Sequence, residues 1–301
     1  MRLAWLLAAA MLVGTAILAA GSARIVREPA AVPTVSAPTM TATTTPTPRQ
    51  RPTTPVFTKS QRDVLTRRLG RYLAERPGTL SVSARDLTTG LSYTYGKSLR
   101  TATASIVKVD IVIALLLKAQ REKRTLTSSE KALAERAIKV SDNAAASALW
   151  RSIGGADGLA SANRKLGLRD TEPGPGTAWG STTTSAADQV RLLTALTSDE
   201  SSLRSANRRY VRRLMGDVTP EQAWGVSAAG SSAELKNGWL PRERHGGRWT
   251  VNSIGIVRDA GRTLLLAVIS ERGTTMRDGI ETIEHVCETV AASLAKVSGD
   301  R

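Results

Sequence analysis

The sequence predicts an α+β fold in two lobes, because three kinds of hydrophobic pattern follow one another along the chain. Apolar residues recur at helical spacing from residue 59, and then alternate with polar residues through residues 80–95. A helical stretch follows from about residue 101 to 215, and strand patterns return in residues 233–270 before a last amphipathic helix. We therefore expect a helical lobe inserted between strands, with a cleft between the lobes.

Each element of the strand-bearing lobe has its own local signal. The first helix ends at Pro77 and Gly78, which break helices. In residues 80–95 apolar side chains occupy alternate positions on both sides of a TTG turn, which is typical of a β-hairpin with one packed face. Residues 233–240, 248–259 and 261–270 have strand character, and residues 275–297 form an amphipathic helix.

The residues before this domain are typical of an exported protein. Residues 1–27 contain an early arginine, an apolar stretch and small residues up to Ala23, which predict a signal peptide or an uncleaved signal anchor. Residues 28–58 are rich in Thr and Pro and predict a disordered linker. The folded domain is therefore expected over residues 59–301, secreted or held outside the cytoplasm by the N-terminal segment.

Composition narrows the possible partners. The formal net charge is +16, but the basic residues are scattered and aromatic residues make up 4% of the chain, so we expect attraction to an anionic cell envelope and no nucleic-acid partner. The single cysteine, Cys287, leaves neither a lipid-bearing N-terminal cysteine nor an internal disulfide. No metal-binding motif occurs, so we expect no metal or cofactor, and we expect a monomer.

Ser105 and Lys108 stand three residues apart at the start of the apolar run ATASIVKVDIVIALLL. On a helix this spacing makes the hydroxyl and the amine neighbours, and a buried amine loses its proton more readily and can act as a base. Ser128 and Lys131 repeat the spacing, but there a serine at the start of a charged helix is a cap. Only the first pair predicts chemistry.

Two further short motifs follow in order. Ser141, Asp142 and Asn143 form an S-D-N sequence at a helix boundary, where all three would also serve as caps. Downstream, residues 236–238 read K-N-G on an expected strand, where a glycine often marks the close approach of a ligand or another backbone. A similar K-L-G at residues 165–167 predicts only the end of a helix.

The order S-x-x-K, S-D-N, K-x-G resembles the penicillin-recognising serine hydrolases, in particular secreted actinobacterial proteins related to class A β-lactamases and their DD-peptidase relatives. The resemblance covers residues 59–298. It implies a β-lactamase/transpeptidase-like fold, with an antiparallel five-stranded sheet flanked by N- and C-terminal helices and an inserted helical lobe. It also implies an acyl-enzyme and, as the leading activity, β-lactam hydrolysis. The alternatives are a D-alanyl-D-alanine peptidase acting on peptidoglycan stem peptides and an inactive envelope-binding domain.

The resemblance also implies roles for single residues. Ser105 would be the nucleophile and Lys108 would take its proton, while Ser141 would pass a proton to the departing nitrogen. Asn143 would hydrogen-bond both the substrate and Lys108. Lys236 would attract the carboxylate of the substrate.

Other positions depart from the family pattern or match it only in part. Gly238 would let substrate lie along the strand, and the amides of Ser105 and Trp239 would form the oxyanion hole. Asn237 replaces the usual Thr or Ser and can still donate a hydrogen bond to a carboxylate. Glu172, followed by proline, matches the glutamate with which class A β-lactamases hydrolyse their acyl-enzyme. The alternative is that Glu172 is an ordinary exposed loop residue. In that case the acyl-enzyme formed with a β-lactam would persist.

Aromatic and histidine residues complete the candidates. Trp179 and Trp239 would either wall the cleft or pack in the core. His245 and His285 are the two candidates for a histidine base, but the sequence has no G-x-S-x-G motif to accompany them. A histidine triad is therefore not expected.

Overall fold

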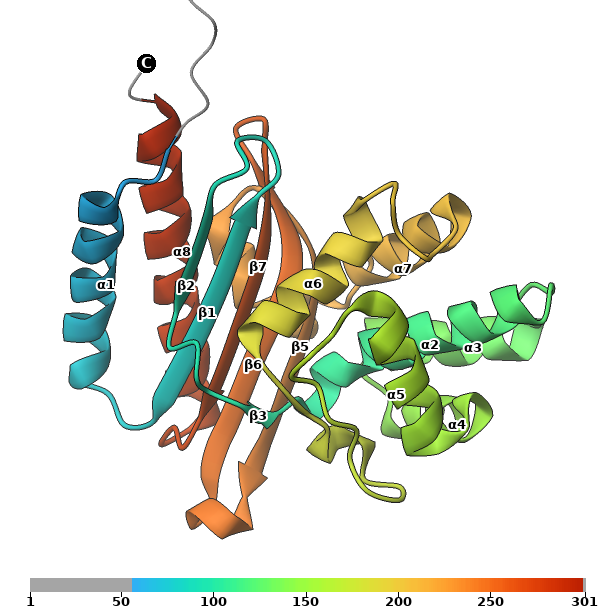
Figure 1. The fold of residues 1–301 in the computed structure, drawn as a ribbon. Helices are drawn as coiled ribbons and strands as arrows, with labels where there is room; N and C mark the ends of the chain where they lie inside the picture. Colours follow the sequence, from blue (N-terminus) through green and yellow to red (C-terminus); the bar gives the residue numbers. More distant parts are fainter. Residues whose placement is uncertain (1–55, 300–301) are drawn as a thin grey trace, which may run out of the picture. The chain divides into compact units, whose positions relative to one another are not determined.

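Five antiparallel strands form one sheet, as the family resemblance implied, and their order is β2-β1-β7-β6-β5 (Figure 1). The computed structural model describes residues 56–299; the expected signal segment 1–27 and linker residues 28–55 lie outside them. The strands are β1 (Thr79–Asp86), β2 (Ser92–Tyr95), β5 (Ser232–Arg242), β6 (Arg248–Asp259) and β7 (Arg262–Glu271). A separate two-stranded ladder joins β3 (Thr101–Ala102) to β4 (Thr183–Thr184).

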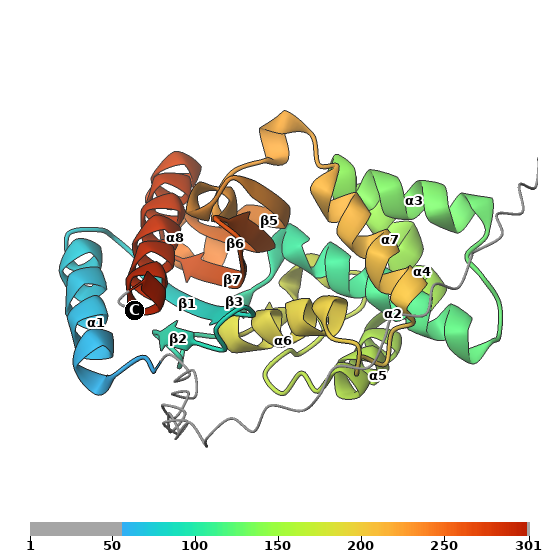
Figure 2. The ribbon, with the colours of Figure 1, turned by 90° about the horizontal axis from the view of Figure 1, so that it is seen from above.

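Helices cover both faces of the sheet, and the two sets come from different parts of the chain (Figures 1 and 2). One face carries α1 (Lys59–Ala74) and α8 (Met276–Gly299). The helical lobe on the other side contains α2 (Val107–Arg121), α3 (Ser128–Lys139), α4 (Asn143–Ile153), α5 (Gly155–Leu166), α6 (Ala186–Thr197) and α7 (Ser205–Gly216). The described residues also form five 3₁₀ turns in the segments between helices and strands: η1 (Ala104–Ile106), η2 (Trp179–Ser181), η3 (Pro220–Gln222), η4 (Val226–Ala229) and η5 (Glu243–His245).

The alternation of side chains along β7 explains how one strand serves two cores. Leu264, Leu266 and Val268 pack with α1 and α8, while Leu265 and the alternate residues after it pack with the helical lobe. A strand covered on both faces reads as a continuous apolar run, because successive side chains point to opposite faces. The sequence RTLLLAVISE fits this environment.

Helix α2 is the centre of the helical lobe. Twelve of its fifteen residues are buried, and α3, α4, α5 and α7 pack around it. A helix that is apolar on all sides is stable only in such a position. The first turn of α2 and the η1 turn before it are therefore held rigidly against the sheet, where η1 contacts β5 and β6.

Local details refine the sequence predictions. The folded chain already includes Phe57, which is 4% exposed and packs against Tyr93, so the ordered region reaches into the expected linker. Thr127, one residue before Ser128, is the cap of α3 and forms a capping box with Glu130. The K-L-G segment ends α5, as predicted, with the terminating glycine in the left-handed conformation.

Among the helices of residues 56–299, none is long and apolar enough to cross a bilayer.

Candidate active site

Ser105 lies in the η1 turn, immediately before α2. Its neighbours Ala104 and Ile106 are buried, whereas Ser105 itself is partly exposed. Ala104 has φ 48°, a left-handed conformation that is unfavourable for a residue with a Cβ atom. Such a backbone is retained only where the surroundings enforce it, so the fold holds the Ser105 turn in one specific geometry.

Lys108 is fully buried in the first turn of α2, yet its ammonium group is well satisfied. Its Nζ donates to Ser141 O (2.5 Å), Ser141 Oγ (3.0 Å) and Asn143 Oδ1 (2.8 Å). Within the described chain it makes no hydrogen bond to Ser105. Burial lowers the pKa of Lys108 to about 8, and the charge of Asp142 opposes that shift.

Lys236 reaches the same group from the sheet. This lysine of β5 is fully buried, and its Nζ donates to Ser141 Oγ (3.1 Å) and Asn237 O (2.8 Å). Burial and the positive charge of Lys108 hold the pKa of Lys236 well below its usual value. Two lysines that share one hydroxyl favour a state in which at least one of them is neutral, which is the state required of a general base.

The S-D-N segment joins α3 to α4 and presents Ser141 to both lysines. Ser141 has φ 57°, again in the left-handed region. Asp142 caps α4 by accepting from Ala145 N (2.7 Å), and it also pairs with Arg136 at 2.5 Å. This junction is therefore fixed at both ends, which turns Ser141 towards the lysines.

Gly238 allows two backbones to approach each other closely. A Cβ atom on Gly238 would lie 2.6 Å from Ser105 N and 2.8 Å from Ile106 N. Gly238 therefore makes room for the Ser105 turn, and its expected role in letting substrate lie along the strand stays a prediction. Asn252 of β6, which the sequence analysis missed, holds the chain just before this turn by donating to Ala102 O (2.9 Å) and Thr103 O (3.0 Å). A buried polar residue in an apolar strand was the signal that could have identified it.

Asn237 and Trp239 point to the other side of β5. The amide nitrogen of Asn237 donates to Gln222 O (2.7 Å) and Trp224 O (3.0 Å), and the side chain is fully buried. Both amide hydrogens are thus used within the protein, and the expected donation from Asn237 to a substrate carboxylate stays a prediction. The Trp239 ring packs 5.7 Å from that of Trp224, in the core that contains α8, and does not wall the lysine site.

In residues 56–299, no hydrogen bond or ion pair joins Glu172 to Lys108 or Lys236. The Glu172 side chain is exposed, and among residues 56–299 its carboxylate makes no hydrogen bond or ion pair. Its backbone pairs with Thr183 in both directions at 2.9 Å. The neighbour of Lys108 from this loop is instead Trp179, whose ring centroid lies 5.1 Å from Lys108 Nζ.

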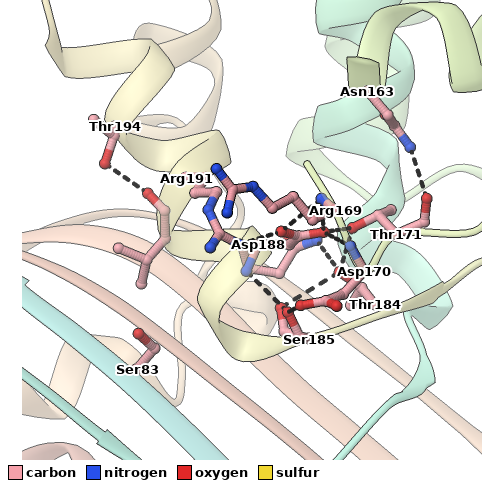
Figure 3. Close-up of polar contacts among 12 residues, drawn as sticks. Ser83, Asn163, Arg169, Asp170, Thr171, Thr184, Ser185, Asp188, Arg191 and Thr194 are labelled. Atoms are coloured by element: carbon pink, nitrogen blue, oxygen red, sulfur yellow. Dashed lines mark hydrogen bonds and ion pairs between the residues drawn. The ribbon is translucent and has the colours of Figure 1, made fainter. Parts of the chain in front are cut away.

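Asp188 anchors the start of the same loop (Figure 3). This buried carboxylate of α6 accepts from Arg169 N (2.9 Å), Asp170 N (2.7 Å) and Thr171 Oγ1 (2.7 Å), and it pairs with Arg191 at 2.5 Å. Four donors on one carboxylate make a strong anchor. The backbone leading to the Glu-Pro pair is therefore determined by α6.

The described residues form neither a histidine–serine pair nor a cluster of metal ligands. His285 stacks on Tyr72 at 3.8 Å between α1 and α8, and His245 lies in η5. Neither histidine hydrogen-bonds to Ser105 in the part of the chain that the structure describes. Over residues 56–299, no group of three or more His, Cys, Asp or Glu side chains could hold a metal ion.

Comparison with known proteins identifies the family of the chain and similar folds. The model of a family described as "Beta-lactamase2: Beta-lactamase enzyme family" matches residues 64–132 and 127–294, well over half of the chain. The chain is also 28% identical over 197 residues to "Putative lipoprotein LppW" of Mycobacterium tuberculosis and Mycobacterium bovis. That match spans 62% of each protein, which is less than two thirds of the relative.

Three solved structures illustrate the similarity of the fold. The TLA-1 extended spectrum β-lactamase has a TM-score of 0.70 at 17% identity, covering 78% of this chain and 99% of that one. A β-lactamase from Xanthomonas campestris pv. campestris has a TM-score of 0.66 at 21% identity, covering 78% and 98%. PBP-A has a TM-score of 0.67 at 20% identity, covering 77% and 96%. At these identities the similarity shows the fold alone.

Proposed function

Because the chain belongs to the beta-lactamase enzyme family, we propose that it is an extracytoplasmic active-site-serine enzyme that is acylated at Ser105 by β-lactams and by D-alanyl peptides of peptidoglycan. One observation carries the proposal: a strained turn bearing Ser105 packs beside two buried lysines that share the Ser141 hydroxyl. These groups come from η1, α2, β5 and the α3–α4 junction, so the fold gathers them from distant parts of the sequence.

In the proposed acylation, neutral Lys108 accepts the proton of Ser105 while Oγ attacks the amide carbonyl. The C–N bond then breaks, and the proton passes from Lys108 through Ser141 to the departing nitrogen. The 3.0 Å contact between Lys108 Nζ and Ser141 Oγ supports this relay. Lys236, on the other side of Ser141, would attract the carboxylate that β-lactams and D-alanyl peptides share.

We expect the acyl-enzyme to be long-lived. Hydrolysis by the class A route needs a carboxylate that takes a proton from the attacking water, and the exposed Glu172 is not held beside Lys108. A penicillin-binding peptidase or sensor fits this arrangement better than a fast β-lactamase. β-Lactam hydrolysis is kept as a second candidate, because Glu172 is followed by Pro173 in the loop after the S-D-N helix, as in class A β-lactamases.

The proposed location outside the cytoplasm rests on residues 1–27 and on the lipoprotein name of the mycobacterial relative. The chain and its mycobacterial relative differ in the cysteine that a lipoprotein requires. The sole cysteine of this chain, Cys287, is buried in α8, where it cannot carry a lipid. An N-terminal segment that holds or releases the domain, rather than a lipid, is therefore the proposed means of localisation.

Intact-mass spectrometry over time after one addition of benzylpenicillin tests this function. Wild type should gain the mass of one penicillin and keep it, and Ser105→Ala should gain none. Ser128→Ala, which alters the other S-x-x-K copy, is the matched control and should behave as wild type. If wild type returns quickly to its free mass while Glu172→Gln stays acylated, β-lactam hydrolysis with Glu172 as base is the function. No adduct on wild type would reject the assignment of Ser105.

A further inference from the structure

The η2 turn lies next to the η1 turn that carries Ser105, and it presents Trp179 to the site. The ring centroid of Trp179 is 5.1 Å from Lys108 Nζ. Lys108 has no exposed surface, whereas Trp179 is partly exposed. The indole therefore stands between the buried lysine and solvent on the side of this loop.

Hydrogen bonds from both tryptophans of this region fix the loop on α4. Trp179 Nε1 donates to Ser147 Oγ (3.0 Å), and Trp150 Nε1 donates to Gly176 O (2.9 Å). Within the loop, Gly174 N donates to Thr182 Oγ1 at 3.0 Å. A Cβ atom on Gly174 would lie 2.1 Å from Ala178 O, so the loop folds tightly on itself. The position of the Trp179 ring is thus specified by contacts on both sides of it.

Among the described contacts of Lys108, the one from the loop that contains Trp179 offers no group that could act as a base. The S-D-N junction contributes Ser141, Asn143 and the charge of Asp142, and β5 contributes Lys236. On the loop side the neighbour is an aromatic ring, which favours a cation at its face but takes no proton from water.

We propose that Trp179 is a positioning residue that shields Lys108 and the acylated Ser105 from water, and so sets the lifetime of the acyl-enzyme. This role rests on the proposed acylation of Ser105. Hydrolysis would break the bond between the acyl carbon and Ser105 Oγ, form a bond from that carbon to the oxygen of water, move a proton from water to a base and return one to Oγ. The indole slows this step by occupying the approach of water and of a base.

The lifetime of the adduct in Trp179 variants tests the proposal. Wild type, Trp179→Ala, Trp179→Gln and Trp179→Phe are acylated with benzylpenicillin, and the acylation and release rates are measured separately by intact mass. Ala and Gln should speed release at least about 10-fold, equivalent to ~1.4 kcal/mol of barrier, while Phe keeps a ring and should remain near wild type. Trp249→Phe in β6, whose ring packs against the core that contains α8, is the control and should change neither rate.

The pH profile of acylation distinguishes shielding from a merely structural role. Burial is the main cause of the lowered pKa of Lys108, so removing the ring should hydrate the lysine and move the midpoint of acylation to higher pH. If the ring acted mainly through its attraction for the cation, the midpoint would move to lower pH, and the proposal would be rejected. Release at the wild-type rate from Ala and Gln variants that still acylate would also reject it. Absence of any adduct on wild type would instead reject the proposed function, and with it this role.

Discussion

Lys108 and Lys236 donate to the same hydroxyl group, with Ser141 Oγ lying 3.0 Å from the first ammonium and 3.1 Å from the second. Both lysines are fully buried, and the pKa of each lies below the ordinary value for lysine. Burial disfavours the charged form of both groups, and the charge of Lys108 adds to this effect on Lys236. The neutral form of Lys108 is therefore accessible near physiological pH, as the proposed acylation requires.

The rate of acylation should rise with pH. The proposed base is neutral Lys108, whose pKa is about 8, so the reactive form increases from pH 6 to pH 9 with a midpoint near 8. Stopped-flow measurement with a chromogenic β-lactam over this range checks the prediction, with thermal unfolding at each pH as a control for stability. A rate that is constant or falls between pH 6 and 9 would contradict the role of neutral Lys108.

Gly238→Ala should impair acylation by displacing the Ser105 turn. The new Cβ atom would meet two backbone nitrogens, Ser105 N and Ile106 N, neither of which can rotate away. We expect a fall of at least about 10-fold in acylation rate, because small misplacements of a nucleophile are costly. The matched control is Gly70→Ala in α1, where the nearest atom is Tyr95 Oη at 3.8 Å, and which should keep the wild-type rate. Equal rates in the two variants would show that the turn tolerates the displacement.

Asn237→Ala should lower stability more than it changes acylation. The substitution leaves Gln222 O and Trp224 O without their buried donor, at a cost of about 1–3 kcal/mol in the free energy of unfolding. Denaturant unfolding measures this cost, and the acylation rate is measured in parallel with Lys236→Ala as the comparison. Loss of acylation with unchanged stability would instead assign Asn237 to the substrate, as the family pattern implied.

Asp110→Asn should remove a pH dependence of stability. Burial and the nearby charge of Asp188 raise the pKa of Asp110 from 3.8 to about 8, so the folded state holds a proton that the unfolded state releases above pH 4. The resulting stabilisation is complete below the unfolded pKa and is lost as pH rises towards 8. Between pH 5 and 7.5 the melting temperature of wild type should therefore fall relative to that of Asp110→Asn, by about 2–4 °C for each kcal/mol.

Ser105→Ala, which leaves Asp110 in place, is the control for this experiment and should follow wild type. Parallel profiles of wild type and Asp110→Asn would show that Asp110 is ionised in the folded protein. The orientation of the Asn163 amide bears on the same question: with its nitrogen facing Asp110 it donates to both carboxyl oxygens, at 3.0 and 3.2 Å, and this contact favours the ionised form. A protonated Asp110 can instead donate to the amide oxygen when that oxygen faces the carboxyl group.

The order of helices and strands could be predicted because it depends on local periodicity. Pro77 and Gly78 do end the first helical region, and the alternating segments do form the antiparallel sheet. The S-x-x-K, S-D-N and K-x-G motifs could be recognised in the same way, because each is a short run of residues. The sequence also indicated that Lys108 would be buried, since the apolar run around it can only be a core helix.

The surroundings of Asn237, Gly238 and Glu172 depend on the tertiary structure. Side chains alternate along any strand, but which set faces the lysines depends on how β5 packs between its two cores. That register turns Lys236 and Gly238 towards the helical lobe and Asn237 away from it. A loop has no periodicity to predict, so the exposure of Glu172 depends on distant partners in α4 and α6.

The sequence by itself therefore determined the α+β order of elements and the motif residues that carry the proposed chemistry, because both depend on residues that are close together in the chain. Only the tertiary structure decided that Trp179, and not Glu172, lies against Lys108. The physical reason is that long-range hydrogen bonds set the conformation of this loop: Asp188 accepts from backbone nitrogens at its start, and the indole of Trp179 donates to Ser147 on α4. Such contacts join residues that are far apart in the chain and leave no local pattern in it.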